Sequence, residues 1–291
     1  MRTMLQTALS GGYAVGYFEA WDQYSLEAVL EAAEESQSPV ILGIGGVMMN
    51  PQWFDGGGLA GLAAVGRTIA ERAGVPVAFL LNEVQTLAQV QLGLRFGFNA
   101  VMLDTSELLL EENIAVTRQV AEAAHACGAD AEGTLDALPD ASGVINPAGI
   151  ALTNPKQALR YVTETGVDAL SVAIGNVHAL TGGEAKVNLA HLARLHQAVE
   201  VPLVIHGGSG FPASAVPRAI ELGVAKFNVG TVLKQRFLEG IRTALAGLSA
   251  RANVQEVVGS RKAGDILSVA AACLKDEVKR RMLLYGSAGK G

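Results

Sequence analysis

Eight short apolar segments, each followed by a longer segment with helical periodicity, constrain the fold of this chain more than any other feature. The apolar segments fall at residues 13–18, 40–44, 75–81, 100–103, 129–132, 169–173, 203–205 and 225–229, and the helical ones at 25–36, 59–73, 84–96, 108–126, 156–165, 188–199, 213–222 and 232–248. Strands that are apolar along their whole length are typical of a parallel sheet buried on both faces. Eight strand–helix units close a (β/α)8 barrel, the TIM barrel. We therefore expect one α/β barrel domain over residues 1–291, with 250–291 as a C-terminal helical extension.

Composition and charge exclude several other classes of protein. A hydrophobic content of 50% is too high for a disordered chain. The formal charge of −6, without basic runs, argues against a nucleic-acid partner. Mean hydropathy is +0.31, but no apolar stretch reaches the roughly 18 residues of a membrane span. Two isolated cysteines and the lack of a signal-peptide pattern predict a cytoplasmic protein.

Polar residues stand where the predicted strands end. Side chains at the carboxyl ends of barrel strands face the active site in this architecture. A single carboxylate after a strand is often only a helix cap or a solvated loop residue, but here several such residues should converge on one mouth. They are Glu19, Asn82, Glu83, Asp104, Glu132, His178, His206 and Asn228.

Two glycine-containing loops follow the last two predicted strands. Successive glycines leave backbone N–H groups accessible to an anion, and barrel enzymes commonly bind phosphate between these two loops. The alternative is that both are ordinary tight turns. The candidate phosphate-binding residues are Gly207, Gly208, Ser209, Asn228, Gly230 and Thr231.

The five histidines divide into two groups. His178 and His206 follow different strands, and imidazoles from separate strands with an acidic residue are typical of an open catalytic metal site. His125, His191 and His196 lie on predicted helices, and the last two are five residues apart, which does not align them on one helix face. We expect those three to be structural.

Over nearly its whole length the chain resembles the class II, metal-dependent fructose-bisphosphate and tagatose-bisphosphate aldolases. The similarity lies in segments such as AGVPV at 73–77, VMLD at 101–104, HGGSG at 206–210, KFNV at 226–229 and GSAGK at 286–290. The resemblance implies a (β/α)8 barrel that assembles as a homodimer or homotetramer. It also implies reversible cleavage of a phosphorylated ketose to dihydroxyacetone phosphate and an aldehyde, with a divalent metal that acts as a Lewis acid and stabilises the enediolate.

The resemblance also implies roles for individual residues. His178 and His206 match metal ligands, and Asp104 and Glu132 match acidic residues at the base of the site. Lys234 matches a basic residue that reaches the second phosphate of a bisphosphate. The residues that match the site for the phosphate of dihydroxyacetone phosphate are Gly207, Gly208, Ser209, Asn228 and Thr231.

The departures from the family fall on the chemistry. The family's Leu-Asp-His-Gly reads LNEV at 81–84, so the catalytic carboxylate is replaced by Asn82 and the first metal-binding His by Glu83. Glu19 stands where the family usually carries Asn, as though a charge had moved between loops, and it becomes our first candidate for proton transfer, with Asp104 and Glu132 next. Glu19 beside a second phosphate would be unfavourable, so a ketose less anionic than a bisphosphate is expected. Ala179 replaces the Gly that follows the strand-six His.

A carboxylate is itself a competent metal ligand, so Glu83, His178 and His206 would form a two-His, one-carboxylate set. Zinc is expected first, and manganese or iron is compatible with the same donors. Alternatively, Glu83 points away and caps a helix that begins near Val84. Two functions stay open: a divergent metal-dependent aldolase with a relocated acid/base, or a non-catalytic sugar-phosphate-binding barrel, such as a partner subunit, that has lost the catalytic Asp.

Overall fold

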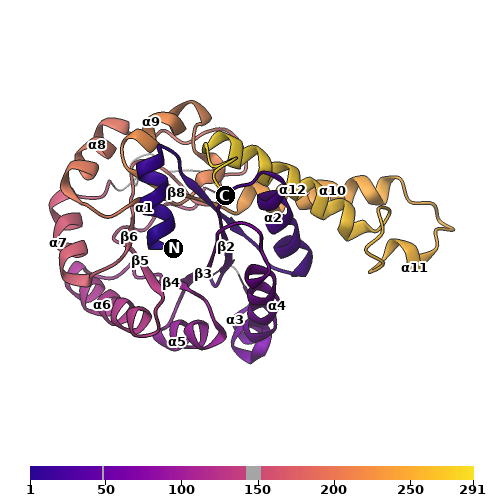
Figure 1. The fold of residues 1–291 in the computed structure, drawn as a ribbon, viewed down its shortest axis with the longest axis horizontal. Coiled ribbons are helices and arrows are strands. Elements are labelled where there is room, and N and C mark those ends of the chain that lie inside the picture. Colours follow the sequence, from indigo (N-terminus) through magenta and orange to yellow (C-terminus); the bar gives the residue numbers. More distant parts are fainter. Residues whose placement is uncertain (48, 142–151) are drawn as a thin grey trace.

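A computed structural model describes residues 1–47, 49–141 and 152–291, and it confirms the (β/α)8 barrel (Figure 1). Eight parallel strands pair in chain order, and β1 closes the sheet against β8. The strands are β1 (Val15–Glu19), β2 (Val40–Gly45), β3 (Val77–Val84), β4 (Ala100–Leu103), β5 (Asp130–Thr134), β6 (Ala169–Ser171), β7 (Leu203–Ile205) and β8 (Val224–Val229). The helices of the outer layer are α2 (Gln23–Glu35), α3 (Pro51–Trp53), α4 (Leu59–Glu71), α5 (Leu87–Phe96), α6 (Leu110–Ala126), α7 (Pro155–Thr165), α8 (Leu189–Ala198), α9 (Val216–Glu221), α10 (Thr231–Ala246) and α12 (Ile266–Leu284).

Side chains alternate between two cores along each strand, because successive residues of a strand point to opposite faces. In β3, Phe79 and Leu81 pack outward against the helices, whereas Ala78 and Leu80 fill the barrel interior. The helix α1 (Arg2–Gly11), which the sequence analysis did not predict, contributes Leu5 and Ala8 to the interior core. It therefore closes the amino end of the barrel, opposite the expected site.

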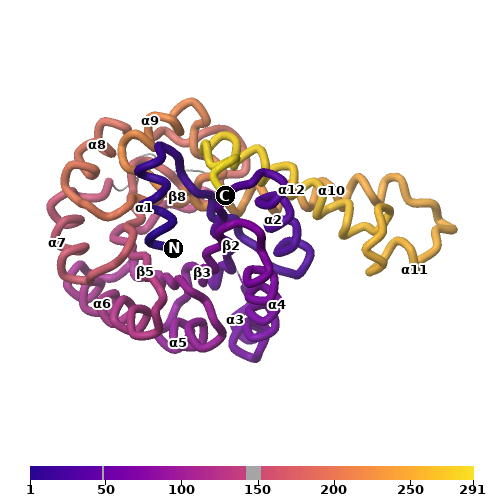
Figure 2. The backbone as a smooth tube through the Cα atoms, viewed as in Figure 1, coloured from indigo at the N-terminus to yellow at the C-terminus, as the bar shows by residue number. Residues whose placement is uncertain are grey.

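The C-terminal region differs in detail from the expectation. The helical extension predicted at 250–291 is interrupted: α11 (Val254–Val257) is separate from α12, which follows its N-cap Asp265. The helices α10 and α12 pack against each other, and their far ends, with α11, extend away from the barrel (Figure 2). Among the described residues, no helix combines the length and apolarity that crossing a membrane requires.

Candidate active site

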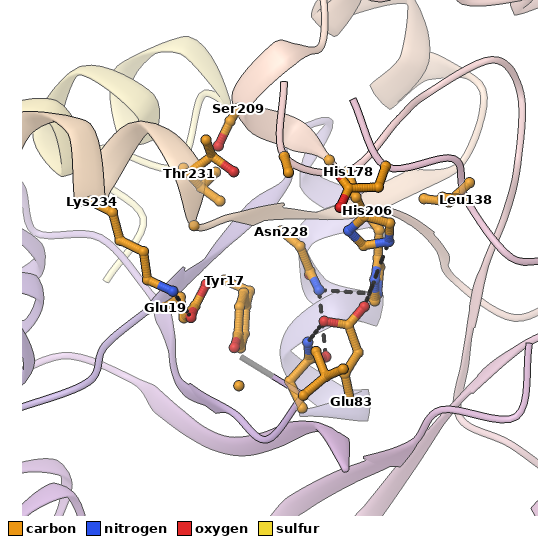
Figure 3. A pocket seen from close by; sticks show the side chains of 18 of the residues that line it. Tyr17, Glu19, Glu83, Leu138, His178, His206, Ser209, Asn228, Thr231 and Lys234 are labelled. Carbon is orange, nitrogen blue, oxygen red and sulfur yellow. Dashed lines mark hydrogen bonds and ion pairs between the residues drawn. The ribbon is translucent and has the colours of Figure 1, made fainter. Parts of the chain in front are cut away.

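A cavity of about 510 Å³ opens at the carboxyl ends of the strands (Figure 3). Most of the residues singled out in the sequence contribute to its wall: Glu19, Asn82, Glu83, Asp104, His178, His206, Gly207, Ser209, Asn228, Gly230, Thr231 and Lys234. Glu132 and Gly208 are buried and are not part of this wall. The residues predicted from the ends of the strands thus meet in one cavity, and they come from six strands and the loops that follow them.

An irregularity at the end of β3 turns Glu83 into the cavity. Strict alternation would place Asn82 inward and Glu83 outward, toward the helices. The register between β3 and β4 shifts between Leu81 and Val84, and Glu83 adopts a left-handed φ of 51°. Such a bulge re-aims a side chain at the expense of local strain. The alternative in which Glu83 caps the next helix is wrong, because α5 begins at Leu87 and its N-cap is Thr86.

Three potential metal ligands converge in the cavity. Glu83 Oε1 lies 3.0 Å from His206 Nδ1 and 3.7 Å from His178 Nε2. The ligand atoms of Glu83, His178 and His206 all lie within 4.8 Å of one another. Two imidazoles and a carboxylate suit Zn²⁺, and the donors also suit Fe²⁺ or Mn²⁺. The residues present therefore fit a divalent cation.

The three candidate ligands differ in the charge that they carry in the metal-free protein. Burial alone would raise the pKa of Glu83, but His206, His178 and Lys226 together lower it to about 2. Burial lowers the pKa of His178, so its ring is neutral at pH 7. Burial would lower the pKa of His206 as well, yet Glu83 and Glu132 raise it to about 9. Without a metal, a proton on His206 therefore compensates the Glu83 carboxylate, and a cation must displace that proton.

Behind His206 lies a buried ion pair. Glu132 accepts a hydrogen bond from Lys226 Nζ at 2.7 Å and lies 2.8 Å from His206 Nε2 through its other oxygen. Both Glu132 and Lys226 are inaccessible to solvent. A carboxylate on the far nitrogen fixes the orientation of a ligating imidazole. The position of Glu132 thus suits support of His206 rather than contact with a substrate.

Asn82 is bound to its neighbour rather than free for chemistry. Its amide Nδ2 donates a hydrogen bond to Glu83 Oε2 at 2.8 Å. An amide can hold the Glu83 carboxylate in this way, whereas the aspartate of the family would repel it. The two substitutions at 82 and 83 are therefore physically consistent with each other.

The two glycine loops lie side by side as expected. Two of their positions also require glycine for a steric reason, because a side chain there would clash with the neighbouring backbone. A Cβ on Gly207 would lie 2.0 Å from Val177 O, and one on Gly208 would lie 2.7 Å from Asn228 O. Ser209 Oγ accepts a hydrogen bond from the backbone N–H of Val232 at 3.2 Å, in the first turn of α10. The loops thus bring the N-terminus of α10, a favourable position for an anion, to the edge of the cavity.

Glu19 and Lys234 form an ion pair at the other end of the cavity from Glu83 (Figure 3). Lys234 Nζ donates to Glu19 Oε1 at 2.7 Å. The other carboxylate oxygen packs against Gly230, where a Cβ would lie only 2.2 Å away. Burial raises the pKa of Glu19, while Lys234 acts in the opposite direction. Glu19 therefore occupies the space beside the anion loop and neutralises the lysine expected to bind a second phosphate.

Asp104 and Ala179 complete the rim. Asp104 is exposed and accepts hydrogen bonds from the N–H and the hydroxyl of Ser106, at 3.1 and 2.7 Å. Ala179 has a φ of 53°, the left-handed region that favours the glycine of the family. The backbone next to His178 is thus strained, as often observed at functional sites.

Several residues of the site escaped the sequence analysis. Lys226 interrupts an apolar strand, and a lysine in a buried strand is a signal that could have been noticed. Arg281 on α12 donates to Gly208 O at 3.2 Å and to Ser209 O at 3.4 Å, and nothing in its helical context indicated this role. Asp140 also lines the cavity. Backbone hydrogen bonds between its loop and His178 hold it there. The family that the chain resembles has a lid sequence at the segment that reads PDASG at 139–143 here, and residues 142 and 143 lie outside the described residues.

The barrel and the two-His, one-carboxylate cluster define the class as a TIM-barrel protein with a candidate metal centre. Comparison with known proteins makes this more specific. The family model for fructose-bisphosphate aldolase class-II matches residues 1–290. A fructose-bisphosphate aldolase from Geobacillus stearothermophilus is 34% identical over 292 residues, covering all of this chain and 97% of that protein. The chain therefore belongs to the class II fructose-bisphosphate aldolase family.

Solved structures agree with this assignment. The YdjI aldolase from Escherichia coli K12 superposes with a TM-score of 0.83 at 29% identity, covering 99% of this chain and 97% of that one. A fructose-bisphosphate aldolase from Campylobacter jejuni gives a TM-score of 0.79 at 21% identity, covering 99% and 95%. The latter supports the fold alone.

Proposed function

We propose that this protein is a metal-dependent aldolase that reversibly cleaves a phosphorylated ketose to dihydroxyacetone phosphate and an aldehyde. The observation that carries the proposal is the convergence of Glu83, His178 and His206 within 4.8 Å of one another, in a family of aldolases. A divalent cation bound there, most simply zinc, supplies Lewis-acid polarisation of the ketose carbonyl. Glu132 and Asn82 orient the ligands, His206 and Glu83 respectively.

The substrate phosphate is proposed to bind between the loops after β7 and β8. Backbone N–H groups near Ser209 and Thr231, with the N-terminus of α10, favour an anion there. The far end of the substrate should carry little negative charge, because Lys234 is already paired with Glu19. A ketose monophosphate is therefore preferred over a bisphosphate.

Proton transfer requires a group other than Asn82, because an amide cannot accept a proton at neutral pH. Glu19 stays the first candidate: it lines the cavity, and its burial raises the carboxyl pKa above its ordinary value, the direction that a general base requires. It would have to exchange its contact with Lys234 for one with the substrate. Asp104 is the second candidate, an exposed carboxylate in the same wall.

We also propose a homo-oligomer, dimeric or tetrameric. Its support is apolar surface on the arm formed by α10, α11 and the loops that flank α11. The exposed residues are Leu238, Leu245, Leu248, Val254 and Val258. Exposed apolar surface of this kind often marks an interaction site. Sedimentation equilibrium tests it, and a monomer at micromolar concentration would contradict it.

One observation favours the second function, a non-catalytic barrel that binds a sugar phosphate. The carboxylates of Glu83 and Glu132 are balanced by protonated His206 and Lys226, so the cluster is charge-neutral without an ion. In that case dihydroxyacetone phosphate would bind but would not be enolised.

Deuterium exchange distinguishes the two functions. Metal-loaded protein is incubated with dihydroxyacetone phosphate in D2O, and exchange of the C3 proton is followed by NMR. An aldolase exchanges this proton in the metal-loaded state and not after chelation. Glu83→Gln should lose exchange, while His196→Gln, a matched change outside the site, should retain it. Binding without exchange in loaded wild-type protein would favour the non-catalytic barrel.

A further inference from the structure

Tyr17 is a large polar side chain held inside the barrel beneath the cavity. It is the third residue of β1 and belongs to the interior core, with 2% of its surface exposed. Gly43 on the neighbouring strand makes room for the ring, since a Cβ there would lie 1.8 Å from Tyr17 Cε2. Lys226 Nζ lies 5.0 Å from the ring centroid on the other side. The ring is therefore fixed by its surroundings.

The hydroxyl of this fixed ring has no hydrogen-bond partner among the residues that the structure describes. Buried polar groups are nearly always paired, so such an orphan requires an explanation. Tyr17 lines the same cavity as Glu83 and Glu19, and it lies between them in the close view (Figure 3). A phenylalanine would fill the same space without an unpaired hydroxyl.

The phenol is also kept in its protonated form. Burial raises the pKa of Tyr17 well above 10, and the nearby carboxylates of Glu19, Glu83 and Glu132 act in the same direction. The group therefore carries a proton to donate at any working pH. Although these acids surround it, none accepts that proton in the structure.

We propose that the Tyr17 hydroxyl is a catalytic hydrogen-bond donor to an oxygen of the bound substrate, between the metal ligands and the Glu19–Lys234 pair. This inference rests on the proposed function and names the group that contacts the middle of the ketose. The phenol stays neutral throughout: it donates a hydrogen bond without transferring its proton. A donor placed in advance in a buried site strengthens most where an oxygen gains negative charge during C–C cleavage.

The test compares Tyr17→Phe with Tyr161→Phe. Tyr161 is equally buried, but its hydroxyl donates to Thr117 at 2.9 Å, away from the cavity. Deuterium exchange into dihydroxyacetone phosphate, the Kd for that ligand, the metal content and Tm are measured for both. We expect Tyr17→Phe to lower the maximal exchange rate roughly 100-fold. We expect its Kd to rise only about 2- to 10-fold, the equivalent of one net hydrogen bond.

Stability separates this role from a structural one. Because the hydroxyl is unpaired in the free protein, Tyr17→Phe should keep its metal and show an unchanged or higher Tm. Tyr161→Phe should instead show a lower Tm with exchange at the wild-type rate. An exchange rate for Tyr17→Phe within twofold of wild type would overturn the proposal. So would a Tm loss larger than that of Tyr161→Phe, since the hydroxyl would then have a partner in the free protein.

The same measurements distinguish failure of this inference from failure of the proposed function. If loaded wild-type protein does not exchange the proton, the aldolase function fails and the Kd alone decides the role of Tyr17. Weaker binding by Tyr17→Phe would then support a ligand contact, and an unchanged Kd would overturn it.

Discussion

Restoring the aspartate of the family at position 82, alone, should damage the site rather than repair it. Asn82→Asp would replace a hydrogen bond by two carboxylates at the 2.8 Å now separating Asn82 Nδ2 from Glu83 Oε2, a repulsion of about 6 kcal/mol at an effective dielectric of 20. Protonating one carboxyl with an ordinary pKa near 4 limits the penalty at pH 7 to about 4 kcal/mol. We therefore expect the metal-free variant to lose about 3–4 kcal/mol of unfolding free energy.

The partner substitution should remove this penalty. Glu83→His recreates the family's Asp-His pair, so the double variant Asn82→Asp/Glu83→His should be more stable than the sum of the two single changes predicts. Urea denaturation in chelator at pH 7 gives the double-mutant cycle, with an expected coupling of at least 1 kcal/mol. The defect of Asn82→Asp should shrink toward pH 4, because the carboxyl whose folded pKa is raised becomes protonated in the unfolded state as well. Additivity within about 0.5 kcal/mol would refute the reasoning.

Four further expectations concern strain, protons and charge. Ala179→Gly relieves a left-handed φ of 53° and should stabilise the protein by about 1 kcal/mol in thermal unfolding, and no gain would contradict this account of the strain. His206 has a folded pKa of about 9, above its unfolded value of about 6.5, so its protonation stabilises the metal-free protein fully below pH 6.5. Denaturation curves should show that this stability is lost as the pH rises toward 9, and a flat pH profile would contradict the prediction. Glu19→Gln should lower kcat at least about 100-fold, whereas undiminished turnover would pass the role to Asp104. Glu19→Gln should also free Lys234 and improve the kcat/KM ratio of bisphosphate to monophosphate ketose, and a wild-type preference for the bisphosphate would contradict the charge argument.

The fold followed from the sequence because burial on both faces leaves continuous apolar strands, and eight of them admit few arrangements. The helix α1 was not predicted, although Met4, Leu5, Ala8 and Leu9 recur at helical spacing, because it precedes the first strand and lies outside the repeating strand–helix pattern. The sequence pattern misplaced the ends of elements near the site, where the backbone is irregular. The strand pattern ends at Leu81, yet β3 continues to Val84, because a register shift lets the chain bulge.

The residues that form the site were predicted from the ends of the strands, but the contacts between their side chains were not. Glu83 was a candidate ligand or a helix cap, and only the left-handed φ at that residue decides that it faces the cavity. The ion pair of Glu19 with Lys234 joins residues 215 positions apart and depends on the small size of Gly230. Contacts of this kind depend on three-dimensional packing that periodicity does not encode.

The central claim is that Glu83, His178 and His206 hold one divalent cation. Calorimetric titration of Zn²⁺ into chelator-stripped protein at pH 7 tests it most directly, with Glu83→Ala and the control His196→Ala alongside wild type. We expect one site per chain with release of a proton, because the cation displaces the proton of His206. Glu83→Ala should lose affinity at least about 100-fold, and His196→Ala should bind as wild type does. A wild-type chain that binds no cation, or a Glu83→Ala variant with undiminished affinity, would contradict the claim.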